Sequence, residues 1–362
     1  MKLPCITLLA TLLLTVPAAA QLQITPPATT PSAPAEKQKP KPPAPAKKQE
    51  AAPAPKPSAS PKPSPSPSPS PKPAATVIPA PPTDDPNVDL VFGAYQRGQY
   101  KTAFELATAR AQAGDPKAMT MLGELYSNAM GIRRDYAKAA EWYKRAADAG
   151  DREAMFALAM LRISGRGGKV DKNEAVRLMA SAAKLGEPKA AYNLALLYLD
   201  GQTLPQDVRR SAELLRQAAD AGLPEAQYAL ATFYKEGTGV PKDAERAVRL
   251  LQAASLADNV DAEVEYAIAM FNGTGTPKNQ PAAVALLRKA SRQGSAIAQN
   301  RLAWVLINGV GVPTDKVEGF KWHLVAKTSG KGDPELDKQL SELPAEDRSK
   351  AEAAARKWLG TK

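Results

Sequence analysis

Residues able to do catalytic chemistry are scarce in this sequence. Its 362 residues include one cysteine, Cys5, and one histidine, His323. A site that needs two imidazoles is therefore excluded. Cys5 lies in a segment that we expect to be cleaved from the mature protein, so a tetrahedral zinc site built from cysteine and histidine is excluded as well. Catalysis in which a histidine activates a nucleophile needs a serine or cysteine close to that histidine, and the sequence indicates none near His323. We interpret His323 as a satisfied histidine on a helix face.

Carboxylate pairs are the catalytic groups that composition leaves open, because hydrolysis of a glycan needs only two suitably placed acids. Nothing in the sequence marks such a pair. The acids that recur at a regular spacing form one column after a turn: Asp135, Asp171, Asp207, Asp243 and Asp315, with Asn279 in the same column. Such side chains cap the free amides of a helix start. We expect no catalytic residue, no cofactor and no metal site.

Gly-x-Gly motifs could bind a phosphate group, but their setting indicates turns. They begin at Gly165, Gly237, Gly273 and Gly309. None follows a predicted strand, as a phosphate-binding loop does, and the pattern returns with the repeat. We therefore expect these glycines to adopt positive φ at helix ends.

All of these motifs belong to a unit of 36 residues that recurs from residue 115 to residue 330. The units are separated by a column of glycines with one exception: Gly114, Gly150, Gly186, Gly222, Asp258, Gly294 and Gly330. A period of 20 to 50 residues is typical of a solenoid built from stacked copies. Composition favours helices, since Ala, Leu, Lys, Glu and Arg dominate. The sequence predicts an all-α solenoid of helix-turn-helix repeats.

Columns of small and bulky residues predict how the units stack. Position 4 of each unit, counted from the boundary residue, is always alanine, and position 9 is always alanine or glycine. Small residues there allow neighbouring helices to approach closely. In the second helix, a column of alanines from Ala146 to Ala326 lies beside the bulky column at position 28, from Trp142 to Trp322. We expect both columns to be core.

In these columns, residues 115–330 resemble Sel1-like repeats, which are related to the tetratricopeptide repeat. The first unit carries the characteristic residues Ala118, Leu122-Gly123, Tyr126, Gly131-Ile132, Asp135, Lys138-Ala139, Trp142-Tyr143 and Ala146-Ala147. The resemblance implies a right-handed superhelix that serves as an adaptor for other proteins, often in bacterial envelopes or secreted. It also implies caps, which we place at residues 87–114 and 331–362. The fifth unit, with Asp258 and Pro281, departs from the pattern, and we expect a change of curvature or a joint there.

The sequence of residues 1–86 predicts that the protein is exported and that it carries an extended arm. Residues 1–20 have the layout of a signal peptide cleaved after Ala20, with an apolar run too short to span a membrane. Residues 21–86 are rich in Pro, Ala, Lys and Ser, and we expect them to be disordered. They would act as a tether in a cell-wall layer or as a solubilising spacer. We expect a periplasmic or secreted protein, with no transmembrane segment after cleavage; retention of residues 1–20 would instead fit an uncleaved anchor or a cytoplasmic scaffold.

The formal net charge is +11. Lys2 contributes +1 and residues 21–86 contribute +4, which leaves about +6 on the rest of the chain. This excess is mild for so long a surface and suits contact with an anionic wall or lipid better than sequence-specific binding of nucleic acid, for which there is no motif. The basic Pro-rich arm of residues 21–86 is the segment we expect to contact the wall.

The partner-binding residues are expected on one face of each first helix. On a helical wheel, positions 3, 6, 10, 13 and 14 lie opposite the positions that stack the units. In related tetratricopeptide repeats this set corresponds to the concave surface that contacts ligands. The candidate anchors are Phe156, Met160, Tyr192, Leu196, Leu199, Tyr228, Phe271 and Trp304. The alternative for each is packing against the adjacent unit.

The sequence therefore leaves two candidate functions. The first is a non-enzymatic envelope adaptor that binds a segment of a partner protein in the concave groove. The second is a module associated with peptidoglycan or another wall polysaccharide, with a role in wall remodelling.

Overall fold

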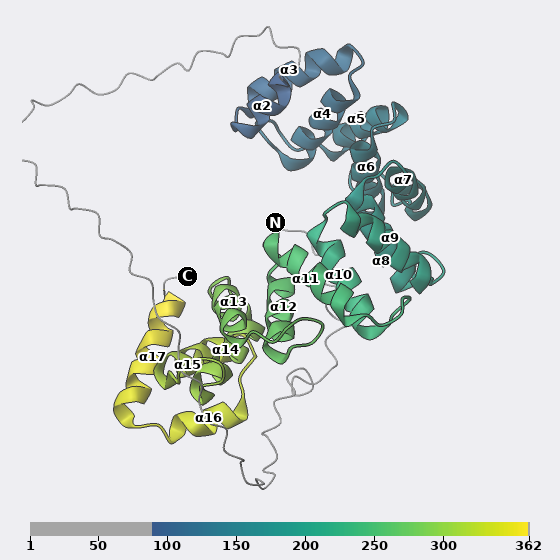
Figure 1. Cartoon of the computed structure of the whole chain (residues 1–362). Helices are drawn as coiled ribbons and strands as arrows, with labels where there is room; N and C mark the ends of the chain where they lie inside the picture. The colour runs from purple at the N-terminus through teal and green to yellow at the C-terminus, as the bar shows by residue number, and fades with distance from the viewer. Residues whose placement is uncertain (1–88, 361–362) are drawn as a thin grey trace, which may run out of the picture. The chain divides into compact units, whose positions relative to one another are not determined.

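The computed structural model describes residues 89–360, and its regular structure in that range is entirely helical (Figure 1). Sixteen helices, α2 to α17, follow one another without a strand between residues 89 and 360. The signal peptide and Pro-rich arm expected in residues 1–86 lie outside the described residues. The predicted all-α solenoid is confirmed.

Each unit consists of two helices of equal length. The first helices are α4 (Pro116–Asn128), α6 (Arg152–Ser164), α8 (Pro188–Asp200), α10 (Pro224–Glu236), α12 (Val260–Asn272) and α14 (Ala296–Asn308). The second helices are α5 (Tyr136–Asp148), α7 (Lys172–Lys184), α9 (Val208–Asp220), α11 (Ala244–Leu256), α13 (Gln280–Arg292) and α15 (Lys316–Thr328). Two helices precede the units, α2 (Leu90–Gln96) and α3 (Tyr100–Gln112), and two follow them, α16 (Pro334–Ser341) and α17 (Ala345–Gly360).

The acidic column starts the second helices, as predicted. In each of these six helices, the Asp or Asn side chain accepts a hydrogen bond from the backbone N–H three residues later. The turn before it needs glycine for two reasons. Gly239 has φ of 66°, in the left-handed region, and a Cβ added there would stand 2.6 Å from the carbonyl oxygen of Val208 in the preceding unit. The Gly-x-Gly turns are therefore structural.

Two columns of alanine hold consecutive helices together. The alanines at position 4, from Ala118 to Ala298, and those at position 32, from Ala146 to Ala326, are at most 2% exposed. Each helix of the units packs against the next one along the chain. The sequence prediction for the bulky column was wrong by one residue, because four of the six side chains at position 28 stay partly exposed. Position 29, from Tyr143 to His323, is buried throughout.

The fifth unit keeps the regular pattern despite its unusual residues. Asp258 adopts φ of 58° and so takes the left-handed conformation that glycine takes at the other boundaries. Pro281 lies in the first turn of α13, where a helix needs no donated N–H. Both α12 and α13 have 13 residues, like the helices of the other units.

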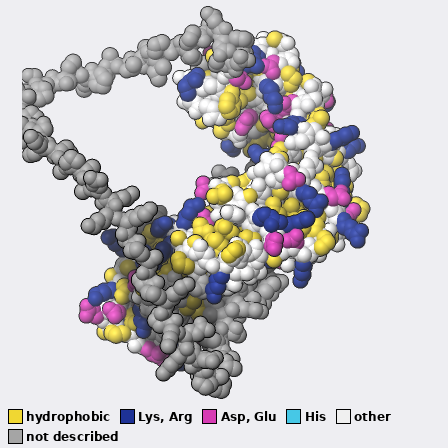
Figure 2. Space-filling model, viewed as in Figure 1, with side chains coloured by type: hydrophobic (Ala, Val, Ile, Leu, Met, Phe, Trp, Pro, Cys, Tyr) yellow, Lys and Arg dark blue, Asp and Glu magenta, His cyan; other side chains and the backbone are white. Residues whose placement is uncertain are grey.

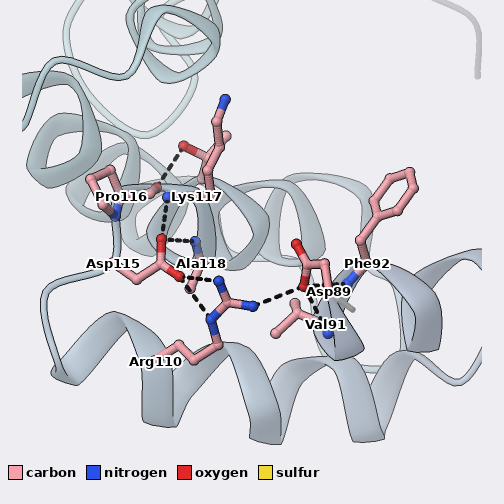
Figure 3. A network of polar contacts seen from close by, with 9 residues as sticks. Asp89, Val91, Phe92, Arg110, Asp115, Pro116, Lys117 and Ala118 are labelled. Carbon is pink, nitrogen blue, oxygen red and sulfur yellow. Dashed lines mark hydrogen bonds and ion pairs between the residues drawn. The ribbon is translucent and has the colours of Figure 1, made fainter. Parts of the chain in front are cut away.

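Polar contacts join the helices at the start of the described chain (Figure 3). The Arg110 guanidinium on α3 lies 2.8 Å from the carboxylate of Asp89, which caps α2, and 2.5 Å from that of Asp115, which caps α4. One cation thus bridges the N-termini of two helices, where the helix dipole favours negative charge.

At the other end, α17 packs on α15, and the rings of Trp322 and Trp358 meet edge to face at 5.1 Å. His323 is fully buried there, and its Nε2 lies 2.9 Å from the carboxylate of Asp337 on α16. The satisfied role that the sequence suggested for His323 therefore holds for Nε2 only, because Nδ1 is buried and has no hydrogen-bond partner among the described residues.

Candidate partner-binding face and family

The candidate face, here called the first-helix face, consists of the partly exposed anchors on the first helices. Seven of the eight predicted side chains are partly exposed: Phe156, Met160, Tyr192, Leu196, Leu199, Tyr228 and Trp304. Each of these offers some of its surface to a partner while the rest packs inward.

Phe271 is the exception, since it is only 4% exposed and belongs to the core. A related position shows the cause. Ile307 stands at position 13 of the sixth unit as Phe271 does in the fifth, and its Cγ1 would lie 2.6 Å from a Cβ added to Gly319 on the second helix of the same unit. Position 13 thus points toward the second helix, which covers Phe271 and Ile307, whereas Leu199 at the same position stays partly exposed. Phe271 is withdrawn from the set of binding residues.

The apolar part of the face spans three consecutive units. Phe156 and Met160 on α6, Tyr192 and Leu199 on α8, and Tyr228 on α10 all pack against the same buried cluster. Hydrophobic side chains gather among charged ones over the middle helices, around α8 to α12, in Figure 2. A common core fixes these side chains, so little conformational entropy would be lost when a partner contacts them.

The face is acidic on α10 and α12. Burial raises the pKa of Tyr228, and the carboxylates of Glu265, Asp261 and Glu236 raise it further. Burial likewise raises the pKa of Tyr192, with a smaller contribution from Glu225. Both phenols are therefore neutral hydrogen-bond donors at physiological pH, and the surface around Tyr228 is negative.

Asp261 and Glu265 lie one turn apart on α12. Burial raises the pKa of Asp261, and the like charge of Glu265 adds to this effect. Glu265 has a cationic neighbour, since its Oε2 lies 3.0 Å from Nζ of Lys235 on α10. An added cation near Asp261 would relieve this repulsion.

Charge is divided unevenly between the two sets of helices. The second helices of the six units contain 17 Lys or Arg and seven Asp or Glu. The first helices contain six Lys or Arg and eight Asp or Glu. The basic excess of the repeats is thus confined to the second helices, and the two sets suit partners of opposite charge.

No group of three or more potential metal ligands occurs within residues 89–360. In the same range, no helix is both long enough and apolar enough to cross a membrane.

Comparison with known families agrees with this architecture. The family model described as "Sel1 repeat" matches six consecutive segments: residues 116–151, 152–187, 188–223, 224–259, 260–295 and 296–330. The chain belongs to the Sel1 repeat family. Sel1 repeat proteins are generally scaffolds for protein interaction, and their fold is generally non-catalytic.

Solved structures of Sel1 repeat proteins are similar to this one. A Sel1 repeat protein from Oxalobacter formigenes is 27% identical, with a TM-score of 0.59, over 66% of this chain and 98% of the other. A protective antigen of uropathogenic Escherichia coli, c5321, is 23% identical with a TM-score of 0.50, over 72% of this chain and 64% of the other, and shows the shared fold. No curated protein matches the chain.

The sequence alone did not identify Asp261 and Glu265 as carboxylates that make the surface around Tyr228 negative. A signal was present, because Lys235 stands at a position where four other units carry Ile, Leu or Phe. A lone cation in a column that is apolar in four of the other units indicates a nearby carboxylate, and Glu265 is that carboxylate.

Proposed function

We propose that this Sel1 repeat protein is a non-enzymatic adaptor of the bacterial envelope that binds a segment of a partner protein on the first-helix face. The observation that carries the proposal is the row of half-buried apolar and aromatic side chains from Phe156 to Tyr228, all fixed by one core cluster. Aromatic anchors held by packing, with charged neighbours, are typical of binding hot spots.

The proposed location is the periplasm or the extracellular space. It rests on the signal-like pattern of residues 1–20, followed by the Pro- and Lys-rich arm of residues 21–86. N-terminal sequencing of the protein from its source cell tests it. We expect the mature chain to begin at Gln21, and a chain that retains Met1 and Lys2 would overturn export by cleavage.

The test of the binding face is a matched pair of double variants. Tyr228→Ala with Trp304→Ala removes two anchors of the first-helix face. Tyr136→Ala with Trp142→Ala removes one tyrosine and one tryptophan, both partly exposed, from the second helix α5. Each full-length variant is first checked by circular dichroism for retained helix content.

Cross-linking in isolated envelopes then reads out the partner. We expect a cross-linked species with the wild-type chain and with the α5 control, and its loss in the Tyr228/Trp304 variant. Undiminished cross-linking by that variant would overturn the assignment of the face.

A second candidate function is contact with an anionic wall polymer, and the basic second helices favour it. Counterion release would make such binding fall as salt rises. Co-sedimentation with purified peptidoglycan, with and without residues 21–86, separates a contribution of the arm from one of the helices. Release of muropeptides in the same assay would reveal a wall-remodelling activity. Absence of both sedimentation and release at low salt would remove this function.

A further inference from the structure

A cleft between the fourth and fifth units adjoins the first-helix face, since Glu265 on its rim is one of the carboxylates that raise the pKa of Tyr228. It lies between α10, α11 and α12 and has a volume of about 250 Å³. Its floor is made by apolar side chains of α11 and α12: Ala244, Ala247, Val248, Leu251, Ile268 and Ala269. Lys235, Glu265, Asn272 and Thr274 form its rim. The cleft is large enough for one aliphatic side chain.

The side chains at two positions of the fourth unit leave the cleft open. Position 13 holds Ile163, Leu199, Phe271 and Ile307 in four of the other units but Lys235 in the fourth, where the side chain ends at Glu265 and does not fill the space. Position 22 varies among the units and is smallest in the fourth, where it is Ala244. The fourth unit therefore has no large apolar side chain at either position.

A second hollow, on the far flank of α11, is larger but less suited to an apolar group. It measures about 470 Å³ and is lined mainly by Glu245, Arg249, Gln252 and the turn at residues 275–277. Val248 is its one large apolar side chain, so a partner would gain little from burial there.

The charge around the cleft is negative although the whole chain is positive. The three helices that form the cleft, α10, α11 and α12, contain six acids and three cations: Lys235, Arg246 and Arg249. Arg301 on α14 is a fourth cation and acts on Glu265. Glu263 is buried and its carboxylate lies 2.8 Å from Nζ of Lys289, so it is already matched. Glu225, Glu236 and Asp261 have no cation within ion-pair distance among the described residues. An acidic partner would be repelled, and a basic one attracted.

We propose that this cleft receives a leucine, isoleucine or methionine side chain of a partner peptide, and that a lysine or arginine next to that side chain pairs with Asp261 or Glu265. The proposal rests on the proposed function, because it names the chemistry of the peptide that the first-helix face binds. Burial of the aliphatic group supplies affinity, and the cation supplies selectivity.

The experiment selects peptides against the full-length protein. A random library of 12-residue peptides displayed on phage is the probe, and enriched peptides are then synthesised with a fluorescent label for anisotropy titration. Ala244→Tyr fills the cleft without changing charge, and Tyr136 shows that the fold accepts tyrosine at this position. Lys172→Tyr is the matched control, because Lys172 holds the same position in the second unit.

We expect enriched peptides to pair an aliphatic residue with an adjacent Lys or Arg. Their affinity should fall about tenfold to a hundredfold in Ala244→Tyr, which is the loss expected when one aliphatic side chain is no longer buried. Lys172→Tyr should bind as the wild type does. Asp261→Asn should weaken binding about two- to fivefold, as expected for one exposed ion pair.

Two results would overturn the proposal. One is enriched peptides that lack the basic and aliphatic pair, or that bind Ala244→Tyr as tightly as the wild type. If such peptides still lose binding in the Tyr228/Trp304 variant, the proposed function stands and only the cleft assignment fails. The other is a library with no enriched peptide, which would remove the cleft proposal and leave cross-linking as the test of the adaptor function.

Discussion

The contact between Gly123 and Tyr143 permits a quantitative test of how the units are packed. Five of the six units carry alanine at position 9, but the first carries Gly123. A Cβ added to Gly123 would stand 2.5 Å from both Cδ1 and Cε1 of the Tyr143 ring. Three other units pair the alanine with leucine at the tyrosine position: Leu215, Leu251 and Leu287. The glycine and the tyrosine therefore form one matched pair.

The magnitudes follow from this geometry. Gly123→Ala forces a buried ring with two atoms at 2.5 Å to move, which costs about 2–3 kcal/mol, while the better helix propensity of alanine returns about 1 kcal/mol. The net loss should be about 1–2 kcal/mol. Tyr143→Leu leaves a cavity opposite the glycine and should cost about 2–3 kcal/mol. Gly123→Ala with Tyr143→Leu recreates the Ala–Leu pair of the other units. It should be more stable than the sum of the single effects by on the order of 1–2 kcal/mol.

Urea unfolding followed by circular dichroism measures the changes in stability. Hydrogen exchange of peptides from α4 and α5 localises them, with peptides from α12 and α13 as an internal control. Tyr143→Phe is a further control, since it keeps the ring and should leave the cost of Gly123→Ala unchanged. Single effects that add without coupling, or a Gly123→Ala variant as stable as the wild type, would refute the reasoning.

Three further predictions concern single residues. Lys289→Met should lower the free energy of unfolding by about 2 kcal/mol, because it leaves the buried carboxylate of Glu263 without the cation that lies 2.8 Å away. An unchanged melting temperature would contradict this. Ala129→Gly should raise the melting temperature, with a gain of about 1 kcal/mol, since Ala129 caps α4 at φ of 57° where later units use glycine; no gain would count against strain at that cap. Burial by itself raises the pKa of Asp151, but hydrogen bonds from Lys117 and the Ala154 N–H outweigh it and hold the pKa below its ordinary value. Asp151 therefore stabilises the fold above the unfolded-state pKa of about 3.9, and this contribution is lost as pH falls through the lower folded-state pKa. Asp151→Asn should cost about 1–2 kcal/mol at pH 7, measured by urea unfolding, and the difference should shrink below about pH 4; a constant difference would exclude the ion pair as its source.

The period made most of the fold predictable. A capping residue or a glycine seen once is weak evidence, but Asp135 and its five successors had to satisfy the same local geometry six times. The alanine columns carried the same information about close helix packing. Departures within a column were harder to interpret. Asp258 and Pro281 suggested a joint, yet each is compatible with its position in a regular unit.

The binding face was less predictable because it depends on contacts between helices. A helical wheel treats one helix in isolation, so it placed Phe271 outside although the second helix covers that position. The cleft required Lys235 and Ala244 to be considered together, and these residues lie on different helices whose contact the sequence does not state. To infer such a cleft from sequence, one would have to know which positions of the first helix contact which positions of the second helix.

Within the six units, helices pack almost entirely on the helices next to them along the chain, and this has a mechanical consequence. A stack of this kind has no long-range contact that must break before the others, so a pulling force applied at its ends would undo it one unit at a time. Each unit of 36 residues would release on the order of 120 Å of extended chain. A protein anchored at one end and pulled at the other would therefore lengthen in equal steps. The tension on its cargo could not exceed the force at which the weakest interface between units separates.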